Sequence, residues 1–449
     1  MTRAARHPAR RYGPTDAIAC RLGAVAVMLG GGTVMGCTEL PAPPRGAADG
    51  GSEPTGTGGS GGASMAPEDA LPVCGPGVGS PCAAVTQLGT GWAHTCALLD
   101  DGTVRCWGAN GAGQLGRGRV SGRETPGVGL TDEQGTLLVG LEHSCVLDDA
   151  GTLHCWGSNA RGQLARDDLP FSATPVTVMA DLASASLSRD GTCGLRRDGE
   201  VHCVGFLLDG QHHTEDFAPR YTTEPWVVDG LDDVTVREVV LGGAYACVWL
   251  MDDTIRCWGH GMWGQLGLGP STRTALTPTE LPQTYPSPVH RIIAKDEGIC
   301  VLAGDPPHPY CWGAALPHAH TSSPSPIEVG FPSEQDRTVR GPASITQLGL
   351  GWRSMCALTE AGEVWCFGDK TFFQVPNHPT DSDYTESTEQ ALPDFDDAVQ
   401  LSMRHTHACV LTDEGAVWCW GRNLDGQIGQ PFLSPRERPT RVDFNGANR

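Results

Sequence analysis

A pair of cysteines about ten residues apart recurs seven times along this 449-residue chain, and this recurrence constrains the fold more than any other feature. A motif that returns about every fifty residues is typical of a repeat architecture, in which each copy is one supersecondary unit. A cysteine pair in every copy indicates an oxidising compartment, because reducing compartments keep thiols unpaired. The pairs are Cys96 and Cys106, Cys145 and Cys155, Cys193 and Cys203, Cys247 and Cys257, Cys300 and Cys311, Cys356 and Cys366, and Cys409 and Cys419.

The residues between the two cysteines predict an antiparallel hairpin. The first copy reads C-A-L-L-D-D-G-T-V-R-C-W-G, so pairing Cys96 with Cys106 places Leu98 opposite Val104 and leaves a three-residue turn that ends at Gly102. Such a turn needs its last residue in the left-handed region, where glycine has no steric penalty. Five copies have glycine there, the fourth has Asp253, and the fifth copy is one residue longer. The opposed positions are apolar in six copies: Leu98 and Val104, Leu147 and Leu153, Leu195 and Val201, Trp249 and Ile255, Leu358 and Val364, and Leu411 and Val417.

This register predicts one disulfide in each hairpin. Directly opposed strand residues have Cβ atoms about 4.5–5.5 Å apart, which suits a disulfide with little backbone movement. Cys74 and Cys82, just before the first repeat, are expected to close a further small loop. Two alternatives remain open, namely buried free thiols in a reducing compartment and metal ligands. The chain has no C-x-x-C, the spacing that zinc sites often use.

The first 72 residues are expected to precede the repeats as a leader and a tether. Residues 22–36 form an apolar stretch that follows several arginines. The stretch is shorter than the about 20 residues of a transmembrane helix and is typical of a secretory signal. It ends V-M-G-C at Cys37, which resembles the lipobox of bacterial lipoproteins. This resemblance implies a lipoprotein signal peptide over residues 1–36 and lipidation of Cys37, while an ordinary signal peptide with an incidental cysteine is the alternative.

Composition shifts divide the rest of the chain. Residues 37–72 are rich in Gly, Pro, Ala and Ser and predict a flexible tether, because they hold too little apolar surface to fold. A disulfide-closed lead-in is expected at 73–83 and the repeat domain at 84–449. The net charge is −21 with only two lysines, Lys295 and Lys370. An acidic chain of this kind is a poor ligand for nucleic acid or anionic lipid, so membrane contact is expected only through the lipid anchor.

The hairpins continue into a second motif, W-G-x-N-x-x-G-Q-L-G. It is clearest from Trp107, Trp156, Trp258 and Trp420 and is reduced in the other three copies. This motif resembles the RCC1 (regulator of chromosome condensation) repeat from about residue 84 to 443. The resemblance implies an all-β fold, a seven-bladed β-propeller with four strands per blade, and here one disulfide per blade. Short strands and glycine-rich turns also suit radial blade packing. A linear solenoid would need polar terminal repeats, and neither terminal copy is polar.

In the RCC1 family, the loops between the first and second strands of the blades face the open side of the disc. In this sequence those loops have a constant frame and variable tips, as expected for a scaffold that presents variable contacts. Exposed Trp, Tyr and Arg side chains are common anchors of protein interfaces. The alternative is that the two tryptophans pack as blade core. The candidate contact residues are Trp92, Leu141, Arg189, Tyr245, Trp352 and His405.

Other polar residues point to structural or solvent roles. His94, His143 and His407 occupy one repeat position, two residues before a cysteine, which predicts a structural hydrogen bond rather than catalysis. A metal site at His308, His318 and His320 is a minor alternative to an idle loop. The acidic stretch 376–397 is expected to be a solvated loop.

The function expected from the sequence is a non-catalytic binding scaffold, anchored in the cell envelope at the outer membrane or cell surface. Its partner would be an extracellular or envelope protein. A carbohydrate-binding propeller that stacks sugars on Trp92, Trp263 and Trp352 is the main alternative, and a glycan or peptide hydrolase or lyase is a weaker one. The chain has no G-x-S-x-G, H-E-x-x-H, P-loop or dinucleotide fingerprint, so no catalytic residue, cofactor or metal is predicted.

Overall fold

The computed structural model describes residues 72–74, 82–130, 134–206, 221–314, 323–329, 344–352, 354–368, 390–392, 395–430 and 433–445. The chain divides into two units, Met1–Ser60 and Gly61–Arg449, and every described residue lies in the second. The predicted signal peptide, Cys37 and nearly all of the tether therefore lie outside the described residues, as does most of the acidic stretch.

The described residues form seven antiparallel sheets of four strands each, and each sheet uses four consecutive strands. We call these sheets blades 1 to 7. Blade 1 contains β1 (Val85–Thr90), β2 (His94–Leu99), β3 (Val104–Asn110) and β4 (Ser121–Leu130). Blade 2 contains β5 (Thr136–Val139), β6 (His143–Leu147), β7 (Leu153–Ser158) and β8 (Phe171–Met179). Blade 3 contains β9 (Leu182–Leu187), β10 (Gly191–Arg196), β11 (Val201–Gly205) and β12 (Thr222–Val227). Blade 4 contains β13 (Val236–Leu241), β14 (Tyr245–Leu250), β15 (Ile255–His260) and β16 (Thr274–Glu280).

Blades 5 to 7 repeat the same order. Blade 5 contains β17 (Val289–Lys295), β18 (Gly298–Ala303), β19 (His308–Gly313) and β20 (Ser323–Glu328). Blade 6 contains β21 (Ile345–Leu350), β22 (Ser354–Thr359), β23 (Val364–Gly368) and β24 (Gln390–Ala391). Blade 7 contains β25 (Ala398–Arg404), β26 (His407–Thr412), β27 (Val417–Gly421) and β28 (Arg436–Arg441).

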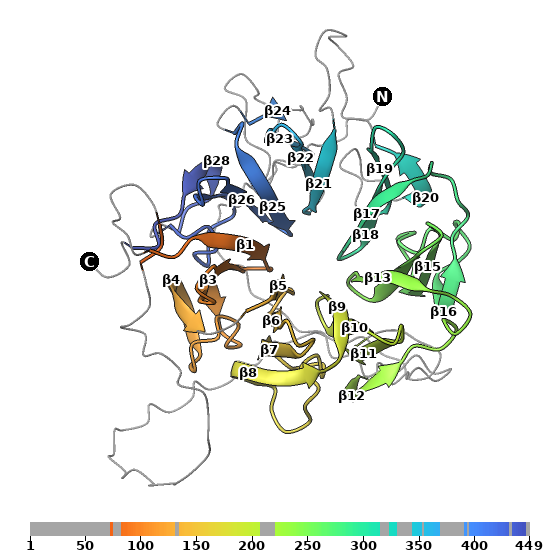
Figure 1. Ribbon diagram of the computed structural model, residues 1–449, viewed down its shortest axis with the longest axis horizontal. Coiled ribbons are helices and arrows are strands. Elements are labelled where there is room, and N and C mark those ends of the chain that lie inside the picture. Colours follow the sequence, from red (N-terminus) through yellow and green to blue (C-terminus); the bar gives the residue numbers. More distant parts are fainter. Residues whose placement is uncertain are drawn as a thin grey trace, which may run out of the picture. The chain divides into compact units, whose positions relative to one another are not determined.

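The blades are arranged in a closed ring with the first strand of each blade innermost (Figure 1). First strands of neighbouring blades contact one another around the axis, and β1 contacts β25, which brings the first and last blades together. The second strands β2, β14, β18, β22 and β26 are buried along their whole length. This burial follows from covering each blade on both faces by its neighbours. The predicted seven-bladed propeller is confirmed.

The predicted hairpin register is also confirmed. Cys96 is the strand partner of Cys106, and Leu98 is the partner of Val104. The turn residues Gly102 and Asp253 have φ angles of 79° and 69°, the left-handed conformation that a three-residue turn requires. The hairpin of each repeat is therefore built as the spacing of its cysteines indicates.

Each blade carries the one disulfide that the register predicted, and its Cα atoms are 4.0–4.1 Å apart. This separation is close to that of opposed, non-hydrogen-bonded strand residues. Cys74 is bonded to Cys82 in the lead-in, as expected. The free-thiol and metal-ligand alternatives are thereby set aside for these sixteen cysteines. In blades 1 to 7 in turn, Cys96 is bonded to Cys106, Cys145 to Cys155, Cys193 to Cys203, Cys247 to Cys257, Cys300 to Cys311, Cys356 to Cys366, and Cys409 to Cys419.

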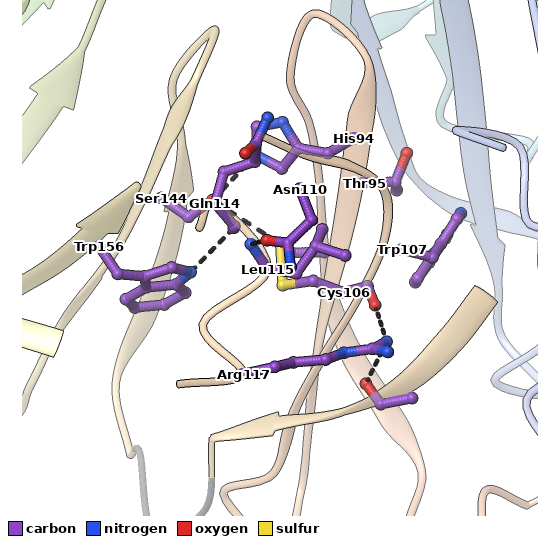
Figure 2. The surroundings of a disulfide bond; sticks show 12 residues. His94, Thr95, Cys106, Trp107, Asn110, Gln114, Leu115, Arg117, Ser144 and Trp156 are labelled. Atoms are coloured by element: carbon purple, nitrogen blue, oxygen red, sulfur yellow. Dashed lines mark hydrogen bonds between the residues drawn. A yellow bond between two sulfur atoms is a disulfide. The ribbon is translucent and has the colours of Figure 1, made fainter. Parts of the chain in front are cut away.

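In blades 1, 2 and 5, the tryptophan that follows the second cysteine is hydrogen-bonded to the blade before it. Trp156 Nε1 donates to the Gln114 carbonyl oxygen of blade 1 at 2.9 Å, as Figure 2 shows. Trp312 makes the same bond to Gln265 across the junction of blades 4 and 5. The W-G-x-N-x-x-G-Q-L motif builds the loop that carries this carbonyl. Within it the Asn110 side-chain oxygen accepts a hydrogen bond from Leu115 N at 3.1 Å (Figure 2).

The junction of blades 7 and 1 closes the ring with the same device. Trp107 Nε1 donates to the Gln427 carbonyl oxygen at 3.0 Å. The Gln400 side chain, on β25, accepts from Leu88 N at 2.8 Å and donates to Leu88 O at 3.1 Å. The lead-in adds a further contact, because Val73 exchanges two hydrogen bonds with the Asn445 side chain.

Candidate binding face

The loops between the first and second strands of the blades form one rim of the ring, which we call the binding face. In the six blades where the structure describes it, the residue that follows the W-G glycine or its equivalent donates a backbone hydrogen bond that holds the loop. In blade 2, Ser158 N donates to Glu142 O at 2.8 Å. In blades 3 and 5, Phe206 N and Ala314 N donate to Asp190 O and Glu297 O, also at 2.8 Å. The backbone of these tips is therefore fixed without the use of their side chains.

An aromatic and cationic cluster lies on this face, built from loops far apart in the sequence. The His405 ring lies 5.4 Å from Trp92 and 5.6 Å from Trp352 between ring centroids. The Arg189 guanidinium lies 5.5 Å from the Trp92 ring centre, in cation–π range. Trp92 and Trp352 are 36% and 42% exposed, so they are not blade core. Trp352 N donates to His405 O at 2.6 Å, which ties blade 6 to blade 7 at the cluster.

Two of the six expected contact residues are not on the surface. Leu141 is 1% exposed, and its backbone carbonyl accepts from Trp92 N at 2.9 Å. Tyr245 is fully buried and its hydroxyl donates to Gly298 O at 2.6 Å. Tyr245 is the first residue of β14, just as His94 at the same repeat position is the first residue of β2. The expectation that these two side chains serve as exposed contacts is wrong, since each packs inward.

A hollow of about 290 Å³ opens beside this cluster, and we call it the axial hollow. It is bordered by residues of blades 3 to 7, among them Arg189, Asp190, Trp263, Glu297 and Trp352. Trp263, on the loop after β15, is 47% exposed. The hollow therefore combines exposed indole surface with charged groups of both signs.

Three carboxylates occupy one repeat position on the binding face, directly before the second strand. They are Glu142, Asp190 and Glu297, of blades 2, 3 and 5. Burial raises the pKa of each, and the nearby Arg189 charge opposes this rise without cancelling it. None of the three side chains makes a hydrogen bond or ion pair within the described part of the chain. These carboxylates were not among the contact residues predicted from the sequence, although all three lie three residues before the first cysteine of their repeat.

Two cations lie where the first strands end near the axis. Five blades have Gly or Ser at this position, and blades 5 and 7 have Lys295 and Arg404. Arg404 is 2% exposed and donates to Val139 O of blade 2 at 3.0 Å. Burial and the Arg404 charge lower the pKa of Lys295 to about 7, while Asp296 opposes the shift. Arg404 thus links blade 7 across the ring to blade 2, a contact that no local sequence pattern indicates.

The repeated histidines make the structural hydrogen bonds that their position predicted. His94 Nε2 lies 2.9 Å from Ser144 Oγ, His143 Nε2 lies 3.1 Å from Thr192 Oγ1, and His407 Nε2 lies 2.9 Å from Thr95 Oγ1. Each bond crosses to the next blade, so we call these three the interblade histidines. Burial lowers the pKa of each to about 3, which keeps the rings neutral at pH 7.

The remaining candidates fall outside this face. His308 lies 4.0 Å from Glu328 as an exposed pair, and His318 and His320 lie outside the described residues. Among the residues that the structure describes, no group of three or more His, Cys, Asp or Glu is placed to hold a metal ion. The described part of the chain forms no helix that is long and apolar enough to cross a membrane.

Comparison with known proteins agrees with the fold. The profile of the regulator of chromosome condensation (RCC1) repeat matches residues 85–114, 139–163, 345–374 and 405–427. The ultraviolet-B receptor UVR8 of Arabidopsis thaliana is 25% identical over 365 residues, which cover 78% of this chain and 80% of UVR8. The human E3 ubiquitin-protein ligase HERC2 is 25% identical over 266 residues, but these are 59% of this chain and only 5% of HERC2.

Solved structures show the same architecture. Prp20p from Saccharomyces cerevisiae superposes with a TM-score of 0.64 at 17% identity, covering 82% of this chain and 88% of Prp20p. Human WBSCR16 superposes with a TM-score of 0.63 at 17% identity, covering 77% of this chain and 96% of WBSCR16. At these identities the likeness concerns the fold alone.

Proposed function

Because this chain belongs to the RCC1 repeat family, we propose that it is a non-catalytic binding scaffold, lipid-anchored at the cell surface, whose binding face holds another protein. The observation that carries the proposal is the cluster of Trp92, Arg189, Trp352 and His405. These side chains come from four different blades and gather on one rim. Aromatic and arginine side chains on a rigid frame are the usual anchors of protein interfaces.

The relatives support a binding role. RCC1-like propellers are mostly regulators or binding proteins rather than enzymes, and Prp20p is described together with its binding to Gsp1p and histones. The ligase activity of HERC2 gives no support to an enzyme here, since this chain matches only 5% of that protein.

The location rests on two features of the sequence. The V-M-G-C segment at Cys37 supports lipidation and an outer-membrane or cell-surface position. Eight disulfides support folding in an oxidising compartment. In cells fed an alkyne-labelled fatty acid, wild type should incorporate the label and Cys37→Ser should not. Equal labelling of the two proteins would refute the anchor.

Partner binding is tested by crosslinking the full chain on whole cells. Wild type should crosslink to a discrete envelope protein, and an Arg189→Ala/Trp352→Ala variant should lose this product. Met251→Ala is the matched control, since Met251 is exposed at a hairpin tip on the opposite rim. A product that survives the double substitution would refute the use of this face.

Carbohydrate binding is the second candidate function, because Trp263 and Trp352 offer exposed indole faces beside a hollow. A glycan array should then show saturable binding that disappears with Trp263→Ala. Binding that persists in this variant would argue against stacking at the hollow.

A further inference from the structure

The axial hollow has the chemistry of a cation receptor. Resting on the proposed protein-binding function, we propose that it receives one basic side chain of the partner, a lysine or an arginine, between Trp263, Trp352 and the carboxylates Asp190 and Glu297. The hollow of about 290 Å³ lies at the lower end of the range for small-molecule sites, about 300–1,000 Å³, which suits one long side chain.

The carboxylates provide the first argument. Asp190 and Glu297 border the hollow on opposite sides of blade 4, and neither has a hydrogen-bonding or ion-pairing partner among the residues that the structure describes. Asp190 is half-buried and Glu297 is exposed, so both carboxylates are open to an entering cation, which could pair with them without breaking an existing ion pair.

The aromatic walls provide the second argument. Trp263 and Trp352 are 47% and 42% exposed and both border the hollow. An indole face attracts an ammonium or a guanidinium within about 6 Å of its centre. Exposed indole next to unpaired carboxylates is therefore a combination that favours a cation over a neutral or anionic group.

The other charges near the hollow agree with this choice. Arg189 is the one guanidinium among the described residues that border it, and it already lies over the Trp92 ring. His260 and His405 also border the hollow, and burial lowers the pKa of both, so they stay neutral at pH 7. Asp296 faces the axial cations Lys295 and Arg404 and is offset by them. Arg189 alone stands against the two carboxylates Asp190 and Glu297, so the charges that border the hollow favour a cation over an anion.

The experiment uses the folded full chain and two probes that differ only in charge, N-acetyl-arginine amide and N-acetyl-citrulline amide. Binding is followed by tryptophan fluorescence and by saturation-transfer NMR of the probe. The arginine probe should bind saturably and the citrulline probe should bind at least about fivefold more weakly. Equal binding of the two probes, or no binding of either, would overturn the proposal.

Variants locate the site. Glu297→Gln and Asp190→Asn should each weaken arginine-probe binding by about fivefold or more, and Glu414→Gln on the opposite rim should leave it unchanged. A neutral oligosaccharide that binds saturably, depends on Trp263 and ignores Glu297→Gln would overturn the proposal in favour of a glycan.

The two proposals fail separately. A partner that still crosslinks to the Asp190→Asn/Glu297→Gln double variant would refute the cation receptor and leave the protein-binding function intact. Charge-selective probe binding without any crosslinked partner would refute the protein-binding function and retain the cation receptor.

Discussion

Two tryptophans offer a matched test of the hydrogen bonds that join the blades. Trp156 and Trp258 both follow the second cysteine of a repeat, precede a glycine and are fully buried. Trp156 Nε1 donates to Gln114 O, whereas Trp258 Nε1 has no partner among the described residues. The residues of blade 3 that correspond to Gly113 and Gln114 are Gly210 and Gln211, which lie outside the described residues.

The magnitudes can be worked from these contacts. Trp→Phe removes similar buried volume at both sites, which costs about 1–3 kcal/mol in each variant. Trp156→Phe also removes a hydrogen bond, although Gln114 O keeps a 3.3 Å bond from Ser144 Oγ, so the added loss is about 1–1.5 kcal/mol. Trp258→Phe removes a buried donor that has no partner among the described residues, which recovers about 1–3 kcal/mol. We therefore expect Trp156→Phe to be less stable than Trp258→Phe by about 2–4 kcal/mol.

The assay is guanidinium unfolding under non-reducing conditions, so that the disulfides stay intact in every variant. The midpoint for Trp156→Phe should fall clearly below wild type, and the midpoint for Trp258→Phe should stay near it. Equal losses in the two variants, or a larger loss for Trp258→Phe, would show that the indole hydrogen bond does not contribute as reasoned.

Three further predictions follow from the ring and its axis. Because the interblade histidines have a pKa of about 3 in the folded protein and about 6.5 when unfolded, the unfolded state binds more protons between these values. Each of these histidines should lower the free energy of unfolding by up to about 1.4 kcal/mol for every unit by which the pH falls between these two values. Unfolding midpoints measured from pH 7 to pH 4.5 should therefore fall less steeply with pH in His407→Asn than in wild type. Arg404→Met should raise the pKa of Lys295 above about 7, which NMR of ¹³C-methylated lysines can follow because the chain has only two lysines; an unchanged pKa would refute the coupling. Gln400→Ala at the junction of blades 7 and 1 should lower the free energy of unfolding by about 1–3 kcal/mol, as should Gln347→Ala at the junction of blades 6 and 7. If Gln347→Ala lowered stability and Gln400→Ala did not, ring closure would be contradicted.

The hairpins and disulfides were predictable from the sequence because each depends on local periodicity. The side-chain period of two and the turn glycine set the pairing of Cys96 with Cys106 before any tertiary contact is considered. The number of blades followed from counting the repeats. These features involve residues within about ten positions of one another, where spacing alone determines register.

The candidate site was only partly predictable. Trp92, Arg189, Trp352 and His405 were found because exposed aromatic and cationic residues at loop tips stand out. Tyr245 was misplaced by counting it as a loop tip, although its offset from Cys247 is the one that starts a strand in every repeat. Arg404 contacts the Val139 carbonyl oxygen, although the two residues are 265 positions apart in the sequence. A pattern within a single repeat cannot predict a contact between residues this far apart.

The construction of the binding face separates its stability from its specificity. The backbone bonds that hold the tips use the carbonyls of Glu142, Asp190 and Glu297 and leave their carboxylates unpaired among the described residues. A substitution such as Glu297→Gln should therefore change what the face binds while altering the free energy of unfolding by less than about 0.5 kcal/mol. Substitutions at the interblade histidines should do the reverse, because those side chains join blades and do not reach the rim. If Glu297→Gln instead lowered stability as much as His407→Asn, the carboxylate would be part of the frame, and the division between a fixed frame and variable tips would fail.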